Sequence, residues 1–152
     1  MNTEKQEFAR NIIKHISRLE RQRRYFLDKH LGAYKLHGSM FLIISFLDRN
    51  PGASQDRLCE YLLIDKSGIA RKCQKLQGLG YIRREQSRDD RRQNNLFLTE
   101  KGKELIPVIR SLLAEWRGIV TKNMDENEQK MLIELLSLME KNALEYNQGE
   151  IL

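Results

Sequence analysis

The chain has 152 residues, of which 40% are hydrophobic and 32% are charged. These values are typical of one soluble globular domain that is long enough to bury a core, and they exclude a disordered chain. The longest apolar runs are too short to span a bilayer. The N-terminus lacks the basic-then-apolar order of a signal peptide, so we expect a cytoplasmic protein without a membrane partner.

The net charge of +6 is unevenly distributed along the chain. Residues 65–92 hold nine Lys or Arg against four Asp or Glu, and residues 1–36 hold the same numbers. Residues 121–152 hold three against seven. A basic centre with an acidic C-terminal stretch favours a polyanion as the partner of the centre.

Two helices are expected before residue 50. Apolar residues recur every three or four positions from Thr3 to Leu31 and predict a long amphipathic helix. The segment from Ser39 to Arg49 is apolar on nearly all sides, which predicts a buried helix. Pro51 ends it, because proline cannot continue a helix.

Two shorter helices are expected next. Ser54 is placed to cap a helix over residues 54–62, and Asp65 is placed to cap a fourth helix. In the fourth helix Ile69, Cys73 and Leu76 have the spacing of one inward face. The residues expected to look outward are Ser67, Gly68, Ala70, Arg71, Gln74 and Lys75.

A hairpin is expected after the fourth helix. Gly78 and Gly80 supply a helix stop, and two short strand candidates, 81–86 and 95–99, are separated by a charged loop. Two short helices followed by such a hairpin are the layout of a winged helix-turn-helix. The predicted fold class is therefore mainly α with a small β-wing.

The remaining residues predict two helices. Thr99 is placed to cap a fifth helix that reaches Met124, and Pro107 predicts a kink or a local adjustment inside it. Asp125 and Glu128 have the spacing of a capping box, which opens a sixth helix to about residue 146. The N-terminal and C-terminal helices carry more apolar surface than one small winged region can cover, so we expect an intertwined homodimer.

Several of these residues together resemble the MarR family of bacterial transcriptional regulators. Their order and spacing match the family pattern, and the arrangement of six helices covers essentially the whole chain. The residues are Asp65-Lys66-Ser67, Arg71, Leu76, Gly80, Asp90-Arg91-Arg92 and Leu98-Thr99-Glu100-Lys101-Gly102.

The resemblance implies one MarR-like domain over residues 1–152. Residues 36–100 would be its winged helix-turn-helix DNA-binding region, and residues 1–31 and 105–148 its dimerisation helices. The homodimer would bind double-stranded DNA at a pseudo-palindromic operator whose half-sites lie about 10 base pairs apart. Family members mostly repress, and many release DNA when a small, often aromatic, effector enters a pocket between the dimerisation and DNA-binding regions.

The outward residues of the fourth helix have expected roles on DNA. Arg71 is suited to bind guanine with its planar fork, and Gln74 to read adenine. Ser67 and Lys75 are suited to hold phosphates. Gly68 and Ala70 stand where the family often has threonine, which favours readout there by shape, thymine methyl contact or water.

The wing has a separate set of expected contacts. Arg92 matches the family's tip arginine, which enters the minor groove. Asp90 would brace it through a charge-assisted hydrogen bond. Arg88 and Arg91 would add phosphate contacts.

Other functions find little support. No phosphate loop, nucleophile–base spacing or paired catalytic carboxylates stand out, so we expect neither an enzyme nor a cofactor. His15, His30 and His37 are scattered, and we expect no metal site. Cys59 and Cys73 have no disulfide or metal spacing and are expected to pack as small apolar residues, although redox sensing by Cys73 is an alternative.

Two questions stay open at this point. Tyr34, His37, Phe41 and Ile44 are candidates for a family-type ligand pocket, but they are equally good core residues, and we favour the core. The alternative function is a winged-helix protein-interaction module without operator binding. The dense arginines of the wing argue against that alternative.

Overall fold

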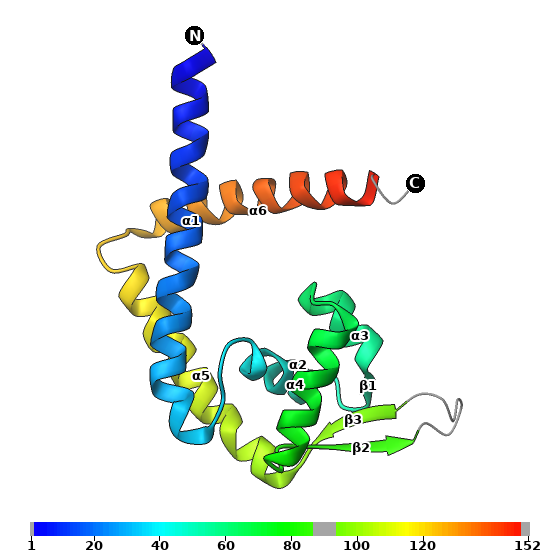
Figure 1. The fold of residues 1–152 in the computed structure, drawn as a ribbon. Helices are drawn as coiled ribbons and strands as arrows, with labels where there is room; N and C mark the ends of the chain where they lie inside the picture. The colour runs from blue at the N-terminus through cyan, green and yellow to red at the C-terminus, as the bar shows by residue number, and fades with distance from the viewer. Residues whose placement is uncertain (1, 87–93, 150–152) are drawn as a thin grey trace. The chain divides into compact units, whose positions relative to one another are not determined.

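The computed structural model describes residues 2–86 and 94–149. The chain divides into two compact units, Met1–Trp116 and Arg117–Leu152. The described residues form six α-helices, one short 3₁₀ turn and a three-stranded antiparallel sheet (Figure 1). The predicted fold class, mainly α with a small β-wing, is confirmed.

The first unit begins with a long helix, α1 (Asn2–Leu31). Its C-terminal end enters the core through Leu27 and Leu31, which are each 2% exposed, whereas Phe8 near its start is 73% exposed. A 3₁₀ turn (Gly32–Tyr34) leads to α2 (Met40–Arg49). Six of the seven large apolar residues of α2 are buried and Leu42 is half-buried, as the sequence predicts for a helix that is apolar on nearly every side.

The helix-turn-helix consists of α3 (Gln55–Leu62) and α4 (Lys66–Gly78). The predicted cap of α3 is confirmed, because the backbone N–H of Arg57 donates to the hydroxyl of Ser54 over 3.2 Å. A short strand, β1 (Ala53–Ser54), precedes α3 and was not predicted. It pairs with a strand more than 40 residues later in the chain, so no local sequence pattern predicts it.

The hairpin consists of β2 (Ile82–Gln86) and β3 (Asn94–Leu98). The sheet order is β1-β3-β2, and Ile82 lies opposite Leu98. The predicted hairpin is confirmed: β2 begins one residue later than predicted, and β3 both begins and ends one residue earlier. Tyr81 closes the end of α4 by donating its N–H to the carbonyl of Leu76, and Thr99 opens the next helix, so neither belongs to the strands.

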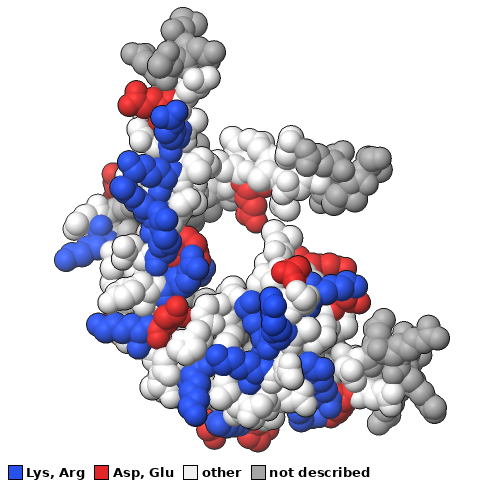
Figure 2. Space-filling view, viewed as in Figure 1, with Lys and Arg blue, Asp and Glu red and all other residues white. Residues whose placement is uncertain are grey.

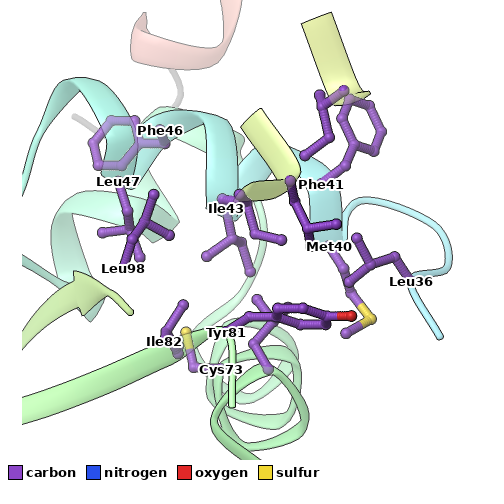
Figure 3. Close-up of a cluster of buried hydrophobic side chains, with 14 of the residues drawn as sticks. Leu36, Met40, Phe41, Ile43, Phe46, Leu47, Cys73, Tyr81, Ile82 and Leu98 are labelled. Atoms are coloured by element: carbon purple, nitrogen blue, oxygen red, sulfur yellow. The ribbon is translucent and has the colours of Figure 1, made fainter. Parts of the chain in front are cut away.

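The core lies where α2, α4 and the sheet meet. Figure 3 shows Cys73 of α4 beside Ile82 and Tyr81, with Ile43 of α2 above them. Ile43 and Cys73 are both fully buried. Contacts in this layer hold one side of α4 in the core. The residues on the opposite side of α4 therefore lie at the surface.

Two helices follow the hairpin, α5 (Glu100–Val120) and α6 (Glu126–Gly149). The helix α5 continues through Pro107 and ends four residues before the predicted Met124. The predicted capping box of α6 is confirmed: the N–H of Glu128 donates to the carboxylate of Asp125, and the N–H of Asp125 donates to that of Glu128, both over 2.9 Å.

The second unit exposes apolar side chains along α6. Met131 is 64% exposed and Ile133 is 63% exposed, and Leu135 and Leu138 are more than half exposed. No helix among residues 2–86 and 94–149 is both long and apolar enough to cross a membrane.

Candidate nucleic-acid interface

The start of α4 is held by Asp65. Its Oδ1 accepts the backbone N–H of Gly68 over 2.7 Å and the hydroxyl of Ser67 over 2.6 Å. These bonds confirm the predicted N-cap. Because Ser67 and Gly68 both donate to the ionised carboxylate, the pKa of Asp65 lies below its ordinary value.

This cap predicts a loss of stability in acid. Since the pKa of Asp65 is lower in the folded chain, the cap's contribution is present above the unfolded pKa, near 4, and disappears as pH falls through the folded value. An Asp65→Asn variant keeps an acceptor oxygen but does not titrate. Its free energy of unfolding, measured by denaturant titration at several pH values, should fall less steeply below about pH 4 than that of the wild type. Equal slopes would contradict an ionised cap.

Four polar side chains lie on the open face of α4. Ser67, Arg71, Gln74 and Lys75 are exposed, and Ala70 between them is half-buried. Arg71 follows the cap by six residues, and its positive charge helps to lower the pKa of Asp65. The face therefore presents one hydroxyl, one guanidinium, one amide and one ammonium group from a helix whose other side is packed in the core.

Gly68 does not belong to this open face, so the prediction that it looks outward is wrong. It is buried, and a Cβ atom built on it would lie 3.0 Å from the side chain of Ile64 and 3.1 Å from Asp65 Oδ2. The turn before α4 folds back over this position, which helical spacing alone does not reveal.

Two basic residues fasten the ends of α4 and do not face its open side. Lys66 Nζ lies 3.0 Å from Asp56 Oδ1 of α3, and this bond raises the pKa of Lys66. Lys101 Nζ donates to the carbonyl of Leu79 over 2.8 Å, just beyond the end of α4. Both residues belong to the family-like motifs of the sequence, and here their contacts are structural.

Cys73 lies on the buried side of α4, as predicted. It is fully buried, and burial raises the pKa of its thiol, whereas Cys59 is half-buried. Because the sulfur of Cys73 is buried and that of Cys59 is more accessible, Cys73 should react much more slowly than Cys59 with a thiol reagent in the folded protein, and at a similar rate in denaturant. Mass spectrometry of labelled peptides over time measures both rates. Faster labelling of Cys73 would contradict its packing role.

The strands β2 and β3 lead to the predicted tip of the wing. The candidate residues Arg88, Asp90, Arg91 and Arg92 lie outside the described residues. Below the tip, the Arg83 guanidinium lies 4.7 Å from the ring centroid of Phe97 on the neighbouring strand and pairs with Glu85. These contacts link side chains of β2 and β3 and stabilise the pairing of the two strands.

A pocket opens on each side of α4. The first, about 330 Å³ in volume, lies between α4, α1 and the start of α2. Of the four predicted pocket residues, only Phe41 lines it; Ile44 is fully buried, Tyr34 is half-buried and His37 is exposed. The residues around it are Glu20, Arg23, Arg24, Leu27, Gly38, Ser39, Phe41, Leu42 and Lys72.

The second pocket, about 650 Å³, lies between α4 and β2 and is lined by Ala70, Gln74, Gln77, Gly78 and Arg84. The side-chain Nε of Arg84 is buried and has no hydrogen-bond acceptor among the residues that the structure describes. Part of the guanidinium therefore lies beneath the surface of this hollow.

Sequence reasoning missed Lys72 and Arg84, which line the two pockets. Lys72 lies about 100° around α4 from Arg71, between the inner and outer faces, so neither pattern selects it. Arg84 points from a strand toward a helix, and a charged residue in a short polar strand gives no signal of that contact. No group of three or more His, Cys, Asp or Glu side chains gathers as metal ligands would within the described residues.

Known proteins match this chain in sequence and in fold. A model of the MarR family matches residues 34–93. The HTH-type transcriptional regulator BilQ of Clostridium symbiosum is 33% identical over 104 residues, which are 68% of this chain and 72% of that protein.

Two solved structures share the fold over most of the chain. A MarR transcriptional regulator from Methanosarcina mazei is 34% identical with a TM-score of 0.83, and the match covers 90% of this chain and 99% of that one. A MarR family regulator from Listeria monocytogenes, solved with a 26-mer DNA, is 25% identical with a TM-score of 0.75, and the match covers 88% and 87%. The chain therefore belongs to the MarR family of winged helix-turn-helix transcriptional regulators.

Proposed function

We propose that this chain binds double-stranded operator DNA by inserting α4 into the major groove. The observation that carries this proposal is the open face of α4, where Arg71, Gln74 and Lys75 are exposed on a helix that is capped by Asp65 and packed from behind. An α-helix with such a face fits the major groove. The relative from Listeria monocytogenes, whose structure contains DNA, supports the same use of the fold.

The side chains of α4 divide into base readers and phosphate binders. Arg71 can bind the O6 and N7 atoms of guanine, and Gln74 can bind adenine, through paired hydrogen bonds. Ser67 and Lys75 contact phosphates and set the register. Ala70 offers a methyl group to thymine, whereas buried Gly68 has no part in this proposal.

The wing adds minor-groove contacts in this proposal. Arg92 enters the groove, Asp90 braces it, and Arg88 and Arg91 bind phosphates. The paired strands β2 and β3 support this role because residues 87–93, which include these side chains, connect them in the chain.

The functional unit in this proposal is a homodimer. Apolar side chains on α1 and on α6 are exposed in the single chain, including Phe8 at 73% and Met131 at 64%. A second copy is the natural cover for such faces. Residues 1–31 and 105–148 would form the dimer, residues 36–100 the DNA-binding region, and the two α4 helices would read half-sites about 10 base pairs apart.

A small molecule would control release of the operator, and the bound protein would act as a repressor. The pocket beside Lys72 supports this part of the proposal, because it lies between α1 and α4 and is lined by the ring of Phe41, by Arg24 and Lys72, and by the ion pair of Arg23 with Glu20. An aromatic molecule that carries an anionic group fits such a lining. A ligand held there would bias the position of α4.

Selection of bound sequences from a random duplex library tests the proposal. We expect enrichment of a two-fold symmetric sequence and a steep loss of affinity between low and moderate salt. Repeating the selection with aromatic carboxylates should reduce recovery of that sequence. Absence of duplex binding even at low salt would contradict the proposal and favour a protein-interaction module.

A further inference from the structure

A buried tyrosine, Tyr81, joins the DNA-reading helix to the segments that lead to the proposed dimer. Figure 2 shows Lys and Arg side chains gathered over α4 on one face of the molecule, and this basic surface has to be held in place. Tyr81 directly precedes β2, and it is 5% exposed. Its N–H, its carbonyl and its side-chain hydroxyl each bond to a different segment of the chain.

The backbone of Tyr81 joins the end of α4 to the start of α5. Its N–H donates to the carbonyl of Leu76, near the end of α4, over 3.0 Å. Its carbonyl accepts the N–H of Thr99 over 3.1 Å. The hydroxyl of Thr99 accepts the N–H of Gly102 over 3.1 Å and so caps α5. The backbone of Tyr81 therefore ties α4 to one of the helices assigned to the dimer.

The side chain of Tyr81 reaches the end of α1, the other helix assigned to the dimer. Its hydroxyl donates to the backbone carbonyl of Tyr34 over 3.0 Å, across 47 positions of sequence. Tyr34 is the last residue of the 3₁₀ turn that directly follows α1. Figure 3 shows the side chain of Tyr81 pointing toward Leu36 and Met40, which follow this turn.

The surroundings of Tyr81 keep this hydrogen bond in place. Burial raises the pKa of the Tyr81 hydroxyl, so the group stays protonated and can donate at neutral pH. The Nζ atom of Lys101 lies 4.8 Å from the centroid of the ring and donates to the carbonyl of Leu79 over 2.8 Å. Because the ring and the hydroxyl are both held, a displacement of the turn after α1 is transmitted to the end of α4.

The position of each α4 relative to the dimer decides which half-site spacing the protein accepts. One added base pair moves a half-site by about 3.4 Å along the duplex and turns it by about 35° around the axis. Two reading helices that are joined rigidly to the dimer should therefore reject such an operator. Binding the correct operator then costs less ordering, because both helices are already in place.

We propose that Tyr81 is a positioning residue that fixes the spacing of the two proposed reading helices through its hydrogen bond to Tyr34. This inference rests on the proposed function, because it requires a dimer that reads two half-sites. Tyr81 is buried and touches no DNA in this proposal. Its hydroxyl therefore contributes to affinity only when both half-sites are bound at once.

A contribution to the fold alone is the competing explanation for the same hydrogen bond. In that case removal of the hydroxyl would lower the free energy of unfolding and leave the binding of the folded protein unchanged on every duplex. The two explanations differ in whether the spacing of the operator matters.

The Tyr81→Phe variant tests the inference, because it removes the hydroxyl and keeps the ring in the core. It should remain folded at the assay temperature, since one hydrogen bond is a small part of the total stability. Circular dichroism checks that it does. Binding is then measured on three duplexes: the selected operator, the same operator with one base pair inserted between the half-sites, and a single half-site.

The three duplexes give different expected results. On the selected operator the variant should lose about threefold to tenfold in affinity, which corresponds to one hydrogen bond. On the single half-site it should stay within about twofold of the wild type, because α4 itself is unchanged. The inserted base pair should weaken binding of the variant less than binding of the wild type, by about threefold or more.

Tyr34→Phe is the matched control. It removes a hydroxyl from the residue that accepts the bond but keeps the backbone carbonyl that Tyr81 contacts. Its affinity for all three duplexes should stay within about twofold of the wild type. Equal losses in the two variants would overturn the inference.

The remaining outcomes separate the inference from the proposed function. A Tyr81→Phe variant that loses as much on the half-site as on the operator would overturn the inference, because the hydroxyl would then act within one reading helix. Unchanged binding on every duplex would also overturn it and leave the proposed function intact. Wild-type protein that binds none of the duplexes would overturn the proposed function and the inference with it.

Discussion

Replacing Gly102 with alanine should lower the free energy of unfolding by about 3 kcal/mol, because the new methyl group has no room. A Cβ atom at this position would lie only 2.1 Å from the carbonyl oxygen of Tyr81. That oxygen cannot easily move, since it accepts two hydrogen bonds from Thr99, one from the backbone N–H over 3.1 Å and one from the side-chain hydroxyl over 3.2 Å. Denaturant unfolding followed by circular dichroism measures the change.

Gly118 supplies a control in the same helix. Among the described residues, no atom outside the adjoining residues and backbone of α5 lies within 4 Å of a Cβ atom built on it, so Gly118→Ala should be neutral or stabilise the protein by up to about 1 kcal/mol, as expected for alanine in an exposed helix. If both variants unfolded alike, the contact with Tyr81 would not be the reason for glycine at position 102.

Replacing Arg71 with alanine should weaken binding to the selected operator by about 1–3 kcal/mol and relax the preference for one base pair, provided that its contact is bidentate. Arg71 is exposed and its side chain does not support the core, so the free energy of unfolding should stay within about 0.5 kcal/mol of the wild type. Binding assays at fixed salt against operators mutated one base pair at a time measure both effects.

The Arg71→Lys variant separates charge from geometry. Lysine keeps the positive charge but lacks the planar fork, so we expect part of the affinity to return without the base preference. A variant that weakens binding to all duplexes equally, with the base preference unchanged, would reassign Arg71 to a phosphate contact.

The caps and the helical periodicities were readable from sequence because they are local. Asp65 and Ser54 accept hydrogen bonds from residues three positions ahead, and Asp125 and Glu128 bond each other, so each prediction needed only a few neighbouring residues. The buried faces of α2 and α4 follow from the same short-range spacing. The signature residues of the family can be recognised in the sequence for the same reason, because each motif is local.

The glycines show the limit of that reasoning. Gly68 looked like an outward position by spacing, but the turn that carries Ile64 covers it. From the sequence, Gly102 is recognised only as part of the family motif. Glycine is required at this position because of the carbonyl of Tyr81, which is twenty-one residues away in the chain. Such close approaches depend on how elements pack, and no local pattern encodes them.

The candidate site divides in the same way. The sequence by itself determined the family, the capped helix that carries Arg71 and Gln74, and the hairpin that follows, because hydrogen-bond caps and apolar periods act over a few residues. Only the tertiary structure brought Lys72 of α4 beside Arg24 of α1, set Arg84 under the other edge of α4, and added β1 to the sheet. These are contacts between segments distant in sequence, and the packing of the core decides them.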